Sequence, residues 1–162
     1  MPEFEDLPAG SPKVAGKRGG EINNYKPVPT NGSLDIALKR NLIHGSYAST
    51  SFVDAQIGKV LHELTRQGLD QNTIVLLWSD HGWHLGEHGI FGKMTNFNVA
   101  TNSPLIIKVP GHASQGKIAN AIVETVDIYP TIAELCGLDY EDDLDGQSLV
   151  PILENTDFKG RS

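Results

Sequence analysis

Polar residues that can bind cations or transfer protons follow directly after an apolar run in this sequence. Asp80 and His81 come after TIVLLW, residues 73–78, and are separated from it by one serine. Asp offers a hard oxygen ligand and neutral His a nitrogen ligand, so two adjacent donors at a strand end can share one metal ion. A carboxylate that caps a turn beside a surface histidine explains the same pair. The pair alone leaves both interpretations open.

The residues that follow favour a site. Residues 83–98, WHLGEHGIFGKMTNFN, place further polar side chains between glycines, namely His84, Glu87, His88 and Lys93. Glycine lets the backbone approach a ligand closely, whereas a mobile surface loop is the alternative for a segment rich in Gly and charge. The apolar side chains of this segment argue for a loop anchored on the core; they are Trp83, Leu85, Ile90, Phe91 and Phe97. We expect Gly82 and Gly86 to be required by the loop conformation.

The flanking patterns predict the elements that position this segment. Apolar residues recur at steps of three and four over 34–69, which predicts one long helix with Ser33 as N-cap and Gly68 as its stop. The run at 73–78 predicts a strand buried on both faces. Residues 104–111, PLIIKVPG, predict a second strand and residues 119–124 a third. Ligands bind outside the carboxyl ends of strands in open α/β sheets, where Asp80 and His81 lie.

The remaining chain completes a layered α/β pattern. Residues 127–135 predict a helix with Pro130 in the first turn and Gly137 at its end, and residues 149–153 a short last helix. Residues 1–32 are rich in Pro and Gly without apolar periodicity and predict an irregular segment, so the folded domain is expected over 33–162. Alternation of helix and strand favours an α/β sheet flanked by helices.

Composition excludes several classes of partner. The net charge of -7 argues against nucleic-acid binding, because phosphate backbones are held by fields of Lys and Arg. No apolar run of about 18 residues is present, so no membrane span is expected. The single cysteine, Cys136, cannot form an internal disulfide, and its place at an apolar helix end predicts a buried structural thiol.

The segment from TIVLLWSDHGWHLGEHG to NVATNSPLIIKVPG resembles the second signature region of the type I sulfatases. The likeness continues through SYASTSFVDAQIGKVLHEL at 46–64 and through VETVDIYPTIAELCGL and DGQSLVPIL, so it covers about residues 40–153. Within the family, the pattern is nearest to the iduronate-2-sulfatase group. The resemblance implies part of an alkaline phosphatase-like fold, with a mostly parallel sheet flanked by helices, and hydrolysis of sulfated carbohydrates.

The resemblance also implies roles for individual residues. Asp80 and His81 match a late pair of metal ligands, usually around calcium, and Lys93 matches a lysine that contacts the sulfate group. Trp83 and His84 match positions at the mouth of the substrate pocket. Glu87 and His88 are expected to fix the loop through hydrogen bonds. Calcium prefers oxygen ligands, so a histidine ligand leaves zinc as an alternative metal. A phosphoester hydrolase of the alkaline phosphatase superfamily is the corresponding alternative enzyme.

The nucleophile of that family is not recognisable here. Type I sulfatases carry C-x-P-x-R or S-x-P-x-R, whose first residue becomes formylglycine, and this sequence contains neither pattern. We therefore expect a carboxyl-terminal part of the catalytic domain that is inactive by itself and that needs the missing amino-terminal part as its partner. A non-catalytic glycan-binding module is the remaining alternative. For the parent enzyme, the resemblance implies a periplasmic, extracellular or lysosomal location.

Overall fold

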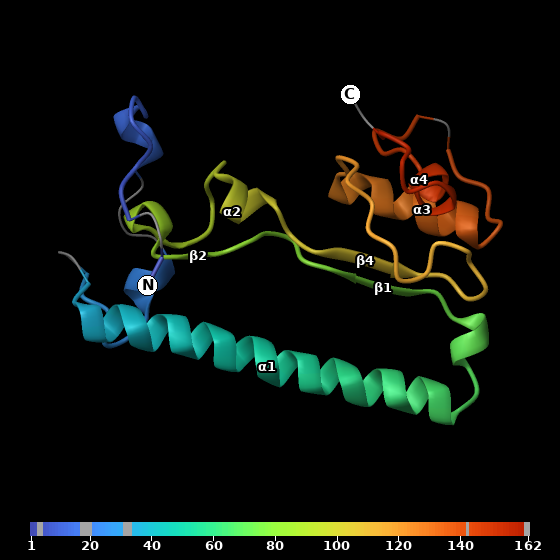
Figure 1. Ribbon diagram of the computed structural model, residues 1–162, viewed down its shortest axis with the longest axis horizontal. Helices are drawn as coiled ribbons and strands as arrows, with labels where there is room; N and C mark the ends of the chain where they lie inside the picture. Colours follow the sequence, from blue (N-terminus) through green and yellow to red (C-terminus); the bar gives the residue numbers. More distant parts are fainter. Residues whose placement is uncertain (3–4, 17–20, 31–33, 142, 161–162) are drawn as a thin grey trace. The chain divides into compact units, whose positions relative to one another are not determined.

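The computed structural model describes residues 1–2, 5–16, 21–30, 34–141 and 143–160. Its α-helices and strands, in chain order, are α1 Ile36–Arg66, β1 Val75–Trp78, β2 His84–Leu85, β3 Phe91–Gly92, α2 Asn98–Thr101, β4 Leu105–Lys108, α3 Ile128–Leu135 and α4 Val150–Glu154 (Figure 1). Short 3-10 turns lie at Lys13–Ala15, Glu21–Asn24, Asp70–Asn72, Glu87–Gly89 and Thr125–Asp127. The predicted mixture of helices and strands is confirmed.

Helix α1 begins and ends at side chains and backbone groups that satisfy its terminal hydrogen bonds. The carboxylate of Asp35 accepts a hydrogen bond from the Leu38 amide at 2.7 Å and forms the N-cap. The predicted cap, Ser33, lies outside the described residues. At the other end Gly68 takes a φ of +69°, and its amide and that of Leu69 close a Schellman motif, as the glycine stop predicts.

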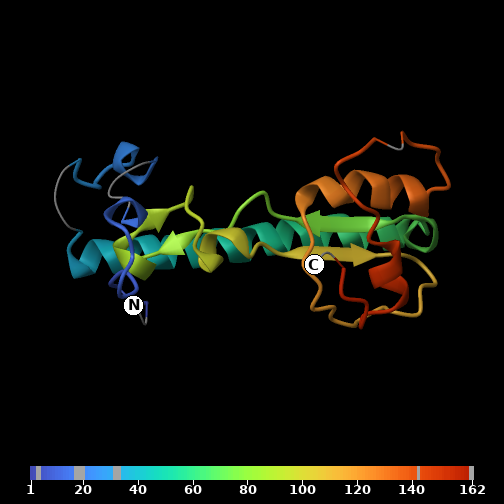
Figure 2. The same ribbon diagram turned by 90° about the horizontal axis from the view of Figure 1, so that it is seen from above.

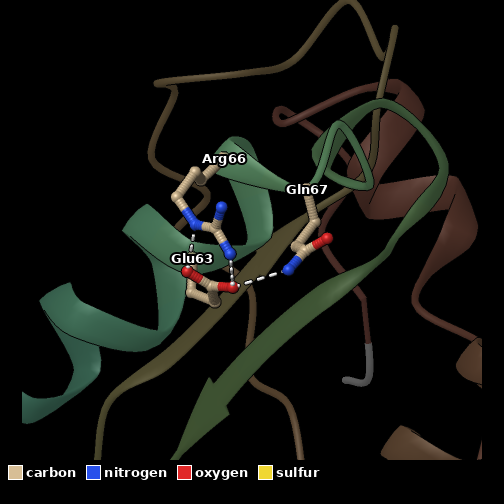
Figure 3. A network of polar contacts seen from close by, with 3 residues as sticks. All are labelled: Glu63, Arg66 and Gln67. Carbon is tan, nitrogen blue, oxygen red and sulfur yellow. Dashed lines mark hydrogen bonds and ion pairs between the residues drawn. The ribbon is translucent and has the colours of Figure 1, made fainter.

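The last turn of α1 also carries a surface network (Figure 3). Arg66 donates two hydrogen bonds of 2.7 Å to the carboxylate of Glu63, and Gln67 donates a third. These bonds lower the pKa of Glu63, with Arg66 as the larger cause. All three side chains are exposed, so we expect the network to contribute little to stability.

The two apolar runs predicted as strands form a two-stranded sheet. Strand β1 lies beside β4, and the two run in opposite directions in Figure 2. A mostly parallel arrangement is therefore not seen in this pair. Leu77 and Trp78 are 39% and 49% exposed, so burial of β1 on both faces is not observed among the described residues. The third predicted strand is wrong, because Ile122 forms only an isolated bridge with Gly160.

The chain divides into two compact units, and the first comprises Met1–Asp70 and Leu77–Ile106. Its buried apolar residues are Val28, Ile90, Phe91 and Ala100, and the last three belong to the segment between β1 and β4. The irregular amino-terminal segment belongs to this unit and is held to α1 by an ion pair of 2.7 Å between Glu5 and Lys39. Helix α1 itself has no buried residue. The repeat of apolar residues therefore predicted the helix but not its exposure.

The second unit comprises Gln71–Leu76 and Ile107–Ser162. The carboxylate of Asp127, which is 1% exposed, accepts hydrogen bonds of 2.8 Å from the amides of Glu124 and Gln147. Helix α3 ends at Gly137 as predicted, in a second Schellman motif. Cys136 is exposed, which contradicts the expected buried thiol. Its place at the C-cap of α3 leaves its side chain uncovered.

Candidate functional site

The end of β1 presents Asp80 on a short turn. The Ser79 amide donates to the carbonyl of Pro104 at 3.1 Å, and the Ser79 hydroxyl donates to the carbonyl of His81 at 2.7 Å. These two bonds fix the backbone on either side of Asp80. The side chain of Asp80 is 82% exposed, so its carboxylate is accessible to a cation.

The ring of His81 has one nitrogen fixed by the backbone. Its Nδ1 lies 3.0 Å from the carbonyl oxygen of Gly82, and because a carbonyl only accepts, Nδ1 must carry the proton. In the neutral ring, Nε2 then has a free lone pair. A ligating histidine commonly donates its other ring N–H to a backbone carbonyl in this way. The chemistry of Asp80 and His81 therefore fits the donors expected for half of a cation site.

No group of three or more His, Cys, Asp or Glu side chains that could hold a metal ion occurs among the described residues. Asp80 and His81 would thus supply two ligands and leave the others to water or to residues elsewhere. Calcium takes six to eight oxygen ligands in ordinary protein sites. The pair cannot hold such an ion tightly unaided.

Lys93 lies beside Asp80 although it is far along the loop. It directly follows β3, and its Nζ is 3.6 Å from Oδ2 of Asp80. The lysine side chain is 34% exposed, and such a solvated ion pair contributes at most about 1 kcal/mol to stability. What matters is the placement, because it brings an ammonium group to the predicted ligand. The catalytic and sulfate-contact roles of Lys93 remain predictions.

Gly82 is required by close packing against a backbone. A Cβ at this position would lie 2.2 Å from the carbonyl oxygen of Val99 and 3.1 Å from Cα of Ala100. The Gly82 amide also donates to the carbonyl of Ala100 at 2.7 Å. The close approach is therefore to helix α2 rather than to a ligand.

His84 lies inside the loop. It is fully buried, with Nδ1 3.2 Å from the carbonyl oxygen of Glu87 and Nε2 2.7 Å from the hydroxyl of Thr95. Burial lowers the pKa of His84, while the hydrogen bond to Glu87 and the nearby Glu87 charge act in the opposite direction. Both ring nitrogens are engaged within the loop, and the substrate contact that the resemblance implies for His84 remains a prediction.

Glu87 and His88 make the contacts expected of loop-fixing residues. The carboxylate of Glu87 accepts a hydrogen bond of 2.6 Å from the amide of Leu85. Nδ1 of His88 donates to the carbonyl of Asp6 at 3.0 Å, and its ring lies 4.2 Å from that of Phe97. These contacts connect the turn with both the amino-terminal segment and the end of the loop.

Trp83 lines an apolar pocket within the first unit. The pocket has a volume of about 250 Å³ and is lined by Ile22, Leu42, Ser46, Ser49, Trp83, Leu85 and Phe91. A substrate contact by Trp83 remains a prediction. The observed surroundings are those of an aromatic residue that packs between α1 and the β2–β3 hairpin.

Sequence reasoning missed Ser79 and Thr95. Their hydroxyl groups hold the backbone of His81 and the ring of His84, respectively. Neither residue has a distinguishing neighbour in the sequence, because a serine or threonine in a loop is ordinary. Only the three-dimensional contacts assign them these functions.

Comparison with known proteins identifies the family. Residues 6–138 match the sulfatase family model. The chain belongs to the sulfatase family. It is 34% identical to human iduronate 2-sulfatase over 163 aligned positions, which cover 82% of this chain and 30% of that enzyme. It spans less than a third of the length of the curated sulfatases it matches.

Solved structures agree with this assignment. A protein from Bacteroides thetaiotaomicron assigned as a sulfatase aligns with 98% of this chain at a TM-score of 0.80 and 25% identity, using 35% of its own length. A second structure, a complex with D-glucosamine-2-N,6-O-disulfate, aligns with 68% of the chain and 22% of its own length at a TM-score of 0.61 and 38% identity. The fold is thus that of the alkaline phosphatase-like sulfatases.

Proposed function

We propose that this chain supplies the cation-binding and sulfate-binding part of a sulfate-ester hydrolase. Asp80 and His81 are ligands of a divalent cation, and Lys93 contacts the sulfate group. The observation that carries the proposal is the 3.6 Å separation of Lys93 Nζ and Asp80 Oδ2, since a carboxylate and an ammonium group at one edge suit a cation and an anion side by side.

Each residue has a distinct task in this proposal. Asp80 offers an exposed carboxylate, and His81 offers Nε2 because its Nδ1 donates to Gly82. Calcium is the cation expected from the family, and a bound cation would polarise the sulfate oxygens. Lys93 binds the negative charge of the sulfate and opposes the charge that develops on the bridging oxygen.

The substrate class we propose is a sulfated carbohydrate. Human iduronate 2-sulfatase and the structure with a disulfated glucosamine are named for such compounds. Because the sequence contains no C-x-P-x-R or S-x-P-x-R, the attacking group must come from residues outside these 162. The exposed apolar side chains on α1, including Tyr47, Phe52 and Val60, support packing against such a region.

Activity assays on protein expressed from the complete open reading frame test the proposal. We expect Lys93→Ala to lower kcat/KM for a sulfated disaccharide about a hundredfold, the usual loss for one preorganised donor. Lys117→Ala, at an exposed lysine outside α1 and outside the loop after β1, is the matched control and is expected to keep full activity. Near-normal activity of Lys93→Ala would overturn the sulfate-contact role.

A cation titration of the same protein tests the ligands separately. We expect Asp80→Ala to abolish calorimetrically detected calcium binding, with Asp157→Ala as the control at an exposed carboxylate outside the loop after β1. Parallel titrations with zinc, and assays with an aryl phosphate, test the phosphoester hydrolase alternative. Tight zinc binding together with faster phosphate cleavage would replace the sulfatase proposal.

A further inference from the structure

We infer that the hydrogen bond between Thr95 and His84 positions Lys93, so that these two are positioning residues for the site. The inference deepens the proposed function, because the importance of the position of Lys93 rests on its proposed contact with sulfate. The Thr95 hydroxyl and Nε2 of His84 are 2.7 Å apart.

The hairpin places Lys93 at the start of a sharp bend. Strands β2 and β3 pair antiparallel with His84 opposite Gly92, so Lys93 leaves the hairpin next to the histidine. Gly92 has a φ of +132° and Met94 a φ of +71°. Lys93 therefore lies between two residues with positive φ, and it is this bend that directs the side chain to Asp80.

The backbone of Met94 is in a strained, left-handed conformation, and packing of the Met94 side chain does not hold it there. A non-glycine residue in the left-handed region costs free energy, and such conformations persist only when the surroundings impose them. The Met94 side chain is 70% exposed, so its own packing contributes little. The constraint must come from the residues that flank it, and Thr95 is the next residue in the chain.

His84 holds two parts of the loop at once. Because Nδ1 donates to the carbonyl of Glu87, Nε2 of the neutral ring is an acceptor and the Thr95 hydroxyl is the donor. The ring is fully buried and packs edge-on against Phe97 at 5.9 Å. Burial also lowers the pKa of His84, which favours the neutral ring that this bond requires. One rigid side chain thus joins the turn at Glu87 to the segment that follows Lys93.

Two substitutions of Thr95 distinguish the effect of its hydroxyl group from the effect of its side-chain volume. Thr95→Val keeps the shape and removes the donor, whereas Thr95→Ser keeps the donor. In crystal structures of the chain, we expect Thr95→Val to move Lys93 Nζ out of ion-pair distance of Asp80 and Thr95→Ser to retain it. Acetylation of Lys93, followed by mass spectrometry, is expected to accelerate about fivefold in Thr95→Val, the factor expected for one lost hydrogen bond.

Thr101→Val provides the matched control. Its hydroxyl donates only within its own helical turn, to the carbonyl of Phe97 at 3.4 Å, so its loss should leave Lys93 unchanged. If Thr95→Val fails to fold, the nitrogen NMR shifts of His84 in the unsubstituted chain still test the idea. We expect a protonated Nδ1 and an unprotonated, hydrogen-bonded Nε2. The opposite tautomer, or an unmoved Lys93 in Thr95→Val, would overturn the inference.

These measurements are independent of the proposed function. If Asp80 and His81 bind no cation, the sulfatase role of the site fails, yet the position of Lys93 in the Thr95 variants still decides whether the hydrogen bond directs it. If the cation binds normally and Lys93 is unmoved in Thr95→Val, only the positioning role fails.

Discussion

The loop that carries the site and the helix that precedes it are held in different ways. Between His84 and Phe97, buried side chains and hydrogen bonds fix nearly every turn, although the segment has only two-residue strands. Helix α1 has 31 residues and none of them is buried. The loop thus depends on buried side chains, whereas no side chain of the helix is buried and its ends are closed by caps. Adding the same atom to each region should therefore have opposite effects.

The largest effect is expected for Gly82→Ala in the loop. The added Cβ would lie 2.2 Å from the carbonyl oxygen of Val99, which is backbone and cannot move aside cheaply. We expect the loop to lose about 3 kcal/mol of stability, the upper part of the range for overpacking. Hydrogen exchange of the amide of residue 82 measures this loss of stability, because that amide donates to the carbonyl of Ala100. Unchanged protection would show that the loop is less tightly packed than the structure indicates.

A pH effect on stability is also expected from the loop. Burial holds the pKa of His84 below its ordinary value of 6.5, so the unfolded chain binds the proton more readily than the folded chain. The free energy of unfolding should keep its full value above that pH and fall as the pH decreases through 6.5 and then through the folded pKa. Denaturant titrations across this range measure the slope.

Two variants test whether His84, which also lies near the charges of Glu87, His88 and His81, determines the pH response. His84→Gln retains an amide that can donate and accept, and it should remove part of the pH slope. His62→Gln, on the exposed helix, controls for the loss of one histidine. An unchanged slope in His84→Gln would mean that burial of this ring does not determine the pH response.

On the helix, Gly58→Ala should have the opposite sign to Gly82→Ala. Nothing lies within 4 Å of a Cβ built at Gly58, so the substitution adds helix propensity without a clash. We expect the free energy of unfolding to rise by about 0.5 to 1 kcal/mol, detected as a higher midpoint in urea followed by circular dichroism. Destabilisation would show that this face of α1 is in contact with something.

The smallest effect is expected at the end of α1. Glu63→Gln breaks the charged bonds from Arg66, but all the side chains involved are in solvent. We expect no measurable change in Tm at physiological salt, because exposed pairs are screened and entropically costly. A clear decrease in Tm would indicate that the network of Figure 3 is protected from water.

The comparison also explains which features the sequence could predict. Apolar periodicity and glycine stops predict the helices, and short apolar runs predict β1 and β4, because these patterns depend on local geometry. Exposure depends on neighbours, so the burial of β1 and of Cys136 was wrongly predicted. Residues 119–124 have strand-like composition, yet Ile122 finds only one bridging partner.

For the site, the sequence pattern and the resemblance mark out candidate polar residues but not how they are held. The resemblance implies one site for Asp80, His81 and Lys93, and Lys93 Nζ lies 3.6 Å from Asp80 Oδ2. The left-handed backbone of Met94 left no signal, since methionine gives no sign of positive φ. The resemblance implies a place for His84 at the pocket mouth, and it gives no sign that the ring is buried in this structure. Its burial follows from the hairpin pairing and from Thr95, which are tertiary features.

No helix among the described residues combines the length and hydropathy needed to span a bilayer. Tryptophan fluorescence offers a further way to study the chain. Its only two tryptophans, Trp78 and Trp83, lie on either side of Asp80 and His81. Trp78 is 49% exposed, whereas Trp83 lines the apolar pocket, so the two indoles should emit at different wavelengths. The tryptophan emission thus originates at residues that flank the proposed cation ligands in the sequence, and it can report on them without any added label.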